Sequence, residues 1–152
     1  MRRTTTIRAL ALLVAAGFAV SAAACGDSGG VSKSAYLAKA KAVCEKGNQT
    51  LHDASNAAFS KVPAGQKPSK PEIEAFVRQT VIPTVREQVK ELRALRPPKG
   101  KEAQVEEIYR ALDKGLDDLE KSPKNLVDGS NPFAEADDLA SKYGISVCAT
   151  TS

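Results

Sequence analysis

Three cysteines and one histidine are the residues of this 152-residue chain whose side chains could most readily do chemistry. Cys25, Cys44 and Cys148 are far apart in the sequence, and His52 is the only histidine. A structural zinc site needs four cysteine or histidine ligands, which no CxxC pair or neighbouring histidine supplies here. The cysteines are therefore candidates for acylation or a disulfide, and we expect no metal and no cofactor.

The residues before Cys25 have the layout of an export signal. They begin with three arginines, continue with the almost purely apolar residues 9–20 and end in small residues. The apolar run is shorter than the roughly 20 residues that span a bilayer, and a polar, glycine-rich segment follows it. We predict that residues 1–24 are a cleaved signal peptide and that residues 25–32 form a flexible tether.

Ala22-Ala23-Ala24-Cys25 resembles the bacterial lipobox, in which small residues precede a cysteine that is diacylated and becomes the new N-terminus. Ala22 stands where leucine is usual. The resemblance implies lipidation of Cys25; the alternative is simple secretion, with Cys25 as a free or paired thiol. Two acyl chains anchor a protein stably where one is marginal. The expected location is the extracytoplasmic face of the cell membrane, with the lipid as the membrane contact.

Cys44 and Cys148 remain as a pair once Cys25 is assigned to lipid. Outside the reducing cytosol, such a pair is expected to form one disulfide. The alternative is two buried thiols. Cys44 lies on the apolar stripe of the first predicted helix, which places it toward the core.

Most of the net positive charge lies in the leader. The chain has 22 basic and 18 acidic residues, and three of the arginines precede Cys25. Charge therefore gives no case for nucleic acid as a partner.

The two halves of the mature chain differ in charge. Residues 33–101 carry 14 basic and 6 acidic groups, and residues 102–152 carry 5 basic and 11 acidic groups. We expect oppositely charged helices to face each other; the alternative is a basic first half that steers toward an anionic membrane or envelope polymer.

Apolar residues recur at helical spacing in four segments, about 32–60, 69–96, 101–121 and 131–144. Proline- and glycine-rich connections separate them. The chain has no tryptophan and few aromatic residues, so the core is expected to consist of alanine, leucine, valine and isoleucine. We predict that residues 33–152 form an all-α domain, an antiparallel four-helix up-down bundle with one disulfide.

Two of these helices have recognisable starts. Ser69 and Glu72 form a capping box in which each side chain can bond the other residue's backbone amide. Asn131 is predicted to be the N-cap of the last helix, with Pro132 as its first residue.

Pro83 lies inside the second predicted helix, where it removes one backbone hydrogen bond and clashes with the carbonyl four residues earlier. The apolar period continues across it, so we expect a kink rather than two helices. The kink either only bends the helix around the bundle or leaves a small ligand cavity beside Thr80, Pro83 and Thr84.

Several short segments carry a wider resemblance. They are Tyr36-Leu37-Ala38-Lys39-Ala40 with Val43-Cys44, Ile82-Pro83, Leu92-Arg93-Ala94-Leu95 with Pro97-Pro98, and Phe133 with Tyr143-Gly144 and Cys148. Together they resemble a group of actinobacterial predicted lipoproteins and secreted helical proteins of uncharacterised function. The resemblance covers most of the mature chain and implies the helical architecture, but it supplies no active site.

No catalytic set is recognisable. Asp53 follows His52 directly, and adjacent helical residues point about 100° apart. No nucleophile motif or phosphate-binding glycine loop accompanies them, and the acidic residues of 102–120 lack the Glu-x-x-His pair of di-iron bundles. We therefore expect no enzyme and no catalytic residue, with His52 on the surface.

Two kinds of binding function remain. The first is an interaction module for another envelope protein or polymer, with contacts from exposed lysines such as Lys61, Lys67, Lys99 and Lys101. The alternative is a carrier or sensor of a small apolar ligand held between the helices.

Overall fold

The computed structural model describes residues 30–149, and the predicted signal peptide and acylation site at Cys25 lie outside them. Within this range the chain forms helices and no strand, so the all-α prediction is confirmed. None of the helices described is both long and apolar enough to cross a membrane.

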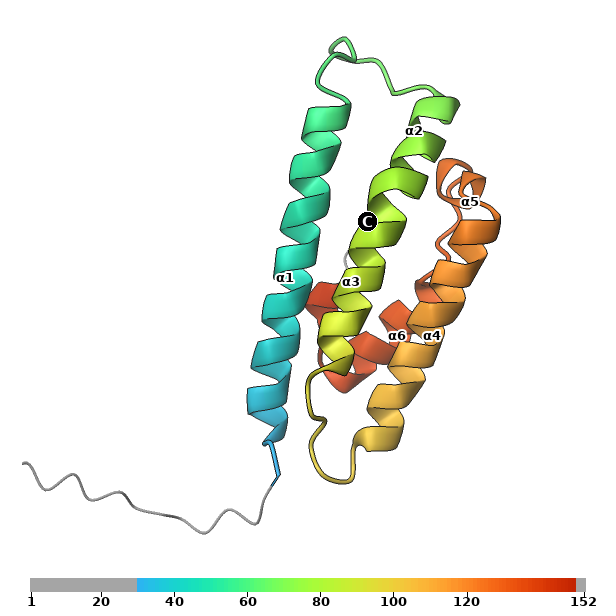
Figure 1. Cartoon of the computed structure of the whole chain (residues 1–152). Coiled ribbons are helices and arrows are strands. Elements are labelled where there is room, and N and C mark those ends of the chain that lie inside the picture. Colours follow the sequence, from blue (N-terminus) through green and yellow to red (C-terminus); the bar gives the residue numbers. More distant parts are fainter. Residues whose placement is uncertain (1–29, 150–152) are drawn as a thin grey trace, which may run out of the picture.

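Three long helical stretches follow one another, each antiparallel to the one before it (Figure 1). They are α1 (Lys33–Ala58), the unbroken series α2 (Lys70–Phe76), η1 (Val77–Val81) and α3 (Ile82–Arg93), and α4 (Glu102–Lys121). The rest of the chain is in shorter pieces, namely α5 (Lys124–Val127), α6 (Ala134–Tyr143) and the 3₁₀ segment η2 (Ser146–Ala149).

The predicted fourth helix is shorter than expected. Asn131 does not cap it: the Asn131 Oδ1 accepts the Phe133 amide at 2.9 Å, which closes a turn before the helix begins at Ala134. Helix α6 therefore has 10 residues, whereas α4 has 20. In Figure 1, α6 lies across the lower half of the long helices, while α5 sits beside the upper end of α4.

The capping box predicted at the second helix is confirmed. The Glu72 carboxylate accepts the Ser69 amide at 2.8 Å and the Ser69 hydroxyl at 2.6 Å. These hydrogen bonds to the charged form lower the pKa of Glu72.

The second helical stretch, from α2 to α3, continues through Pro83, as expected, but the helix type changes just before the proline. Residues Val77–Val81 form a π-helical segment, and the Ile82 amide donates to the carbonyl of Val77, five residues earlier. Pro83 then stands near the start of α3, where its missing amide costs little. The wider π turn is a recognised way to accommodate such a break in the helical ladder.

One core cluster joins α1, α3, α4 and α6 in the half of the molecule that is lower in Figure 1, and we call it the lower cluster. Its buried residues include Tyr36, Tyr109 and Tyr143, which are all the tyrosines of the chain. The Tyr109 hydroxyl donates to the Leu92 carbonyl at 2.6 Å, so the Tyr36 hydroxyl, 3.0 Å away, donates to Tyr109. Burial raises the pKa of both groups, which keeps them protonated as donors. The expectation of a purely aliphatic core was therefore wrong, in this half through the tyrosines and in the other through the buried Phe133.

The predicted disulfide lies in the same cluster. Cys44 and Cys148 are bonded, with their Cα atoms 5.1 Å apart and a sequence separation of 104. Cys44 is fully buried on the stripe of α1 that also carries Tyr36 and Ala40. The bond therefore holds η2 against the middle of α1.

An upper core cluster has a different composition. Its buried residues come from the second helical stretch, from α4 and from the start of α6; they are Val77, Ile82, Val85, Val89, Leu116, Leu119 and Phe133. The buried residues of α1 end at Gly47, and Leu51 is only partly buried against this cluster. The C-terminal half of α1 thus contributes no buried side chain.

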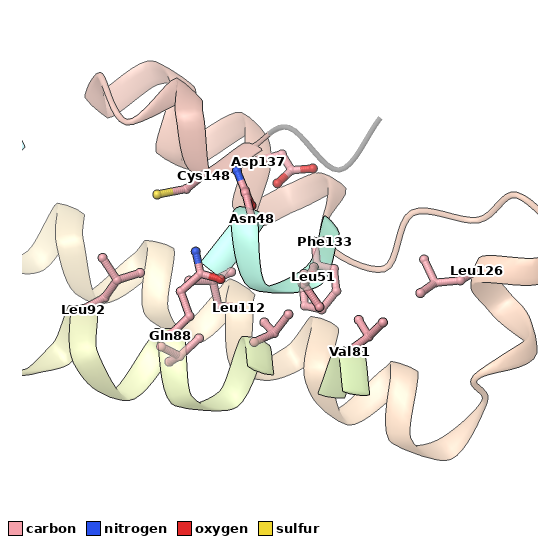
Figure 2. Close-up of a pocket in the computed structure, with 12 residues that line it drawn as sticks. Asn48, Leu51, Val81, Gln88, Leu92, Leu112, Leu126, Phe133, Asp137 and Cys148 are labelled. Atoms are coloured by element: carbon pink, nitrogen blue, oxygen red, sulfur yellow. The ribbon is translucent and has the colours of Figure 1, made fainter. Parts of the chain in front are cut away.

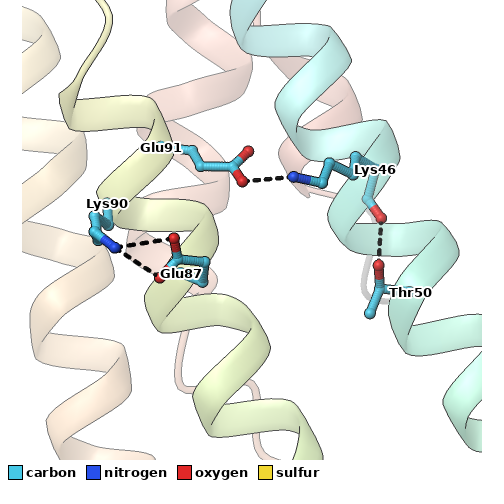
Figure 3. Close-up of polar contacts among 5 residues, drawn as sticks. All are labelled: Lys46, Thr50, Glu87, Lys90 and Glu91. Atoms are coloured by element: carbon cyan, nitrogen blue, oxygen red, sulfur yellow. Dashed lines mark hydrogen bonds and ion pairs between the residues drawn. The ribbon is translucent and has the colours of Figure 1, made fainter.

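Ion pairs link helices of opposite charge, as predicted. Arg93 of α3 pairs with Asp113 of α4 at 2.6 Å and with Glu106 at 3.6 Å, and Arg86 pairs with Glu120. A further pair does not follow this pattern: Lys46 and Glu91, 2.6 Å apart, join α1 to α3, which both belong to the basic first half (Figure 3). Because these groups are exposed, each pair stabilises by at most about 1 kcal/mol.

Candidate functional site

A small apolar pocket of about 80 Å³ lies between the helices where the two core clusters meet (Figure 2). Residues from α1, η1, α3, α4, α5, α6 and η2, together with Phe133 before α6, line it. They are Asn48, Leu51, Val81, Val85, Gln88, Val89, Leu92, Leu112, Leu126, Phe133, Asp137 and Cys148. The pocket is therefore assembled by nearly every element of the fold.

Partly buried leucine and valine side chains form one part of the wall. Leu51 of α1, Val81 of η1 and Leu126 of α5 all pack against the upper cluster without being fully covered. Helix α6 lies across the lower half of the long helices and does not cover these side chains, which remain partly accessible to solvent. This part of the wall is accordingly an apolar surface that a further group can reach.

Phe133 reaches the pocket because α4 has a glycine opposite it. A Cβ built at Gly115 would lie 2.5 Å from the Phe133 ring and 2.8 Å from the Pro132 carbonyl oxygen. Any side chain at this position would push the start of α6 away from α4. Gly115 thus sets how closely the short helix approaches and where the Phe133 ring lies.

Polar groups are few at this site. Asn48, Gln88 and Asp137 line the pocket, and Figure 2 shows Asn48 and Asp137 on the side next to Cys148. Asp137 accepts a hydrogen bond from Asn131 Nδ2 at 2.9 Å, and partial burial raises the pKa of its carboxyl group. An apolar pocket with a carboxylate at one side suits an apolar group that carries a donor or a positive charge nearby.

Gly47 allows α1 and α3 to approach on this side. A Cβ at Gly47 would lie 2.7 Å from the Gln88 Oε1 atom, so the amide of Gln88 rests against the α1 backbone. In contrast to Phe133 at Gly115, this neighbour is the end of a flexible side chain.

The residues predicted to border a ligand cavity do not line this pocket. Pro83 and Thr84 line an open groove of about 350 Å³ between α1 and α3, which Lys46 and Glu91 border, and Thr80 is not among its lining residues. Figure 3 shows this side of the two helices. Val81 and Val85, on another face of the same helical stretch, reach the apolar pocket between the helices instead. Ligand binding beside Pro83 stays a prediction.

His52 lies on the surface of α1, beside Asp53 and Asn56. His52 is exposed; its Nδ1 lies 3.5 Å from Asp53 Oδ1 and 3.2 Å from Asn56 Nδ2. The two neighbours therefore do touch, contrary to the expectation from helical geometry. No group of three or more histidine, cysteine, aspartate or glutamate side chains is placed to hold a metal ion within residues 30–149.

Comparisons with protein-family models, with curated proteins and with solved structures find no match to this chain. The resemblance to actinobacterial lipoproteins thus stays a prediction.

The wall of the pocket can be tested with two glycine substitutions. Gly115→Ala should destabilise the fold by about 1 to 3 kcal/mol, because the Phe133 ring and the Pro132 carbonyl have little room to move. Gly47→Ala should be neutral or stabilising by up to about 1 kcal/mol, since Gln88 can rotate away and alanine favours the helix. Urea unfolding of both variants gives the comparison. Equal effects of the two substitutions would contradict the close approach at Gly115.

Proposed function

We propose that this protein is a lipid-anchored module on the extracytoplasmic face of the cell membrane that acts by binding another protein of the envelope. The leader and the lipobox-like residues before Cys25 support the anchoring. A bilayer anchor made of two acyl chains holds a protein stably at the surface. Binding alone, without catalysis, is the activity.

The observation that carries the binding role is the unequal burial of α1. Its first half is buried through Tyr36, Ala40, Cys44 and Gly47, whereas its second half contributes no buried side chain. We infer that the long helices and α6 make an up-down four-helix arrangement that is incomplete in its upper half. An amphipathic helix of the partner completes it there, in the helix-in-groove mode.

The pocket specifies the chemistry of that helix. A space of about 80 Å³ holds one apolar side chain as an anchor, and the Asp137 carboxylate at its side favours a basic residue next to that anchor. Small-molecule pockets are usually about 300 to 1,000 Å³. This pocket is below that range, and the groove of about 350 Å³ beside Pro83 is open and bordered by the charged Lys46 and Glu91. The alternative function, a carrier or sensor of a small apolar ligand, is therefore supported less well.

Anchoring is tested at the cysteine itself. Cys25→Ala should release the protein from membranes or leave it unprocessed, because no thiol is present to receive the acyl chains. Membrane fractionation and electrophoretic migration report the result. A variant that fractionates and migrates like the parent protein contradicts lipid anchoring.

The partner surface is tested by photo-crosslinking from α1. A photoreactive phenylalanine analogue at Leu51 should yield an adduct in intact cells with one peptide that contains an apolar residue beside a basic one. The same analogue at Leu37, a partly buried leucine of α1 that packs on the lower cluster, should not yield it. Identical adducts at the two positions, or none at Leu51, contradict this surface.

A further inference from the structure

The end of the bundle at which the tether arrives carries a concentration of positive charge. Lys33 is in the first turn of α1, and its Nζ lies 4.8 Å from the centre of the Tyr143 ring at the end of α6. Gly30 lies against the side chain of Lys99 in the connection between α3 and α4. In Figure 1 the start of α1 and this connection lie at the same end of the molecule.

The segments at this end, residues 30–36, 95–103 and 141–145, contain five basic residues and one acidic residue. They are Lys33, Arg96, Lys99, Lys101 and Lys142, with Glu102 as the acid, and all six are exposed. Lys142 pairs with Asp138 at 2.5 Å, while the structure gives Lys33, Arg96, Lys99 and Lys101 no carboxylate partner among the described residues.

The opposite end differs in charge. Residues 59–74 and 119–129 carry five basic and four acidic groups, and Lys70 there is paired with Asp128 at 3.2 Å. The two ends therefore have similar numbers of lysines but different net charge. This difference makes the tether end the more attractive one for an anionic surface.

A hollow of about 350 Å³ opens at the tether end between α1, α4 and α6. Lys33, Lys101 and Lys142 line it, together with Gln104 as a neutral donor and Glu107 as its one carboxylate. Tyr143 also lines it; this residue is 6% exposed, and its hydroxyl has no hydrogen-bond partner. The hydroxyl is buried, so the polar groups that face the hollow are those of the lysines, Gln104 and Glu107. Three ammonium groups around a concave space suit a phosphate group.

The length of the tether fixes what this end faces. Gly30 is five residue steps after Cys25, and five steps span at most about 18 Å when the chain is fully extended. An acylated Cys25 therefore keeps the basic end close to the bilayer surface. Charge attraction operates over about 8 to 10 Å at physiological salt, so the headgroups come within its range.

We propose that this end is a docking face for the anionic phospholipid headgroups of the bilayer, with the three-lysine hollow receiving a headgroup phosphate. The proposal rests on the lipid anchor of the proposed function. The bundle then stands on the membrane, and Leu51, 18 residues beyond Lys33 on α1, lies about 27 Å above the basic end. The pocket is thereby presented to partners rather than to lipid.

Lysine acetylation footprinting of the anchored protein tests this face. The full protein, purified from membranes and bound to vesicles, is acetylated on phosphatidylcholine with 30% phosphatidylglycerol and on phosphatidylcholine alone. Labelling of Lys33, Lys99 and Lys101 should fall about fivefold on the anionic vesicles only. It should recover at about 1 M salt. Lys61, Lys67 and Lys124, at the other end, should label equally on both.

Matched charge reversals separate the face from total charge. Lys99→Glu with Lys101→Glu should abolish the protection of Lys33, whereas Lys61→Glu with Lys67→Glu, the same change at exposed sites of the other end, should leave it intact. Equal labelling of both ends, protection on neutral vesicles as well, or protection by a soluble anionic polymer in place of vesicles overturns the proposal.

The peptides of the acetylated protein also distinguish failure of the docking face from failure of the lipid-anchored function. Mass spectrometry of the N-terminal peptide reports whether Cys25 carries its acyl chains. Their absence contradicts the lipid-anchored function, whereas unprotected lysines on an acylated protein contradict the docking face alone.

Discussion

The bond between Cys44 and Cys148 holds the end of the described chain against the first helix, and the arrangement of the remaining elements depends on it. The two residues are 104 positions apart, and closing a loop of that length stabilises a fold by about 4 to 5 kcal/mol in the chain-entropy model. The bond also keeps η2 beside the Tyr36 and Tyr109 pair, whose hydroxyls satisfy each other and the Leu92 carbonyl. The lower half of the bundle is thus closed covalently, by apolar burial and by hydrogen bonds.

The upper half of the molecule is packed less completely. No side chain of α1 beyond Gly47 is buried, and α6 is too short to cover this half. Binding surfaces are commonly drawn from the less stable parts of a fold, because a partner must be able to reach and order them. In the proposed arrangement the stable lower half lies next to the membrane and the open upper half away from it, so that one small domain can both anchor and bind.

The helices and the disulfide could be predicted because their signals are local or countable. The capping box of Ser69 and Glu72 is visible in four residues, and Cys44 falls on the apolar stripe of its helix. The pocket could not be predicted, because it depends on contacts between distant positions such as Gly115 and Phe133. A glycine inside an otherwise apolar helix face was the available cue. The late start of α6 was missed because Asn131 can cap a turn as well as a helix.

Native-state hydrogen exchange along α1 tests this division most directly, since α1 is one unbroken helix and its two halves differ in their packing. Amides of residues 37–47, which carry the buried side chains, should exchange at least about a hundredfold more slowly than those of residues 49–56. A steep fall in protection near Asn48 is the predicted result. Equal protection along the whole helix would contradict the closed lower and open upper halves.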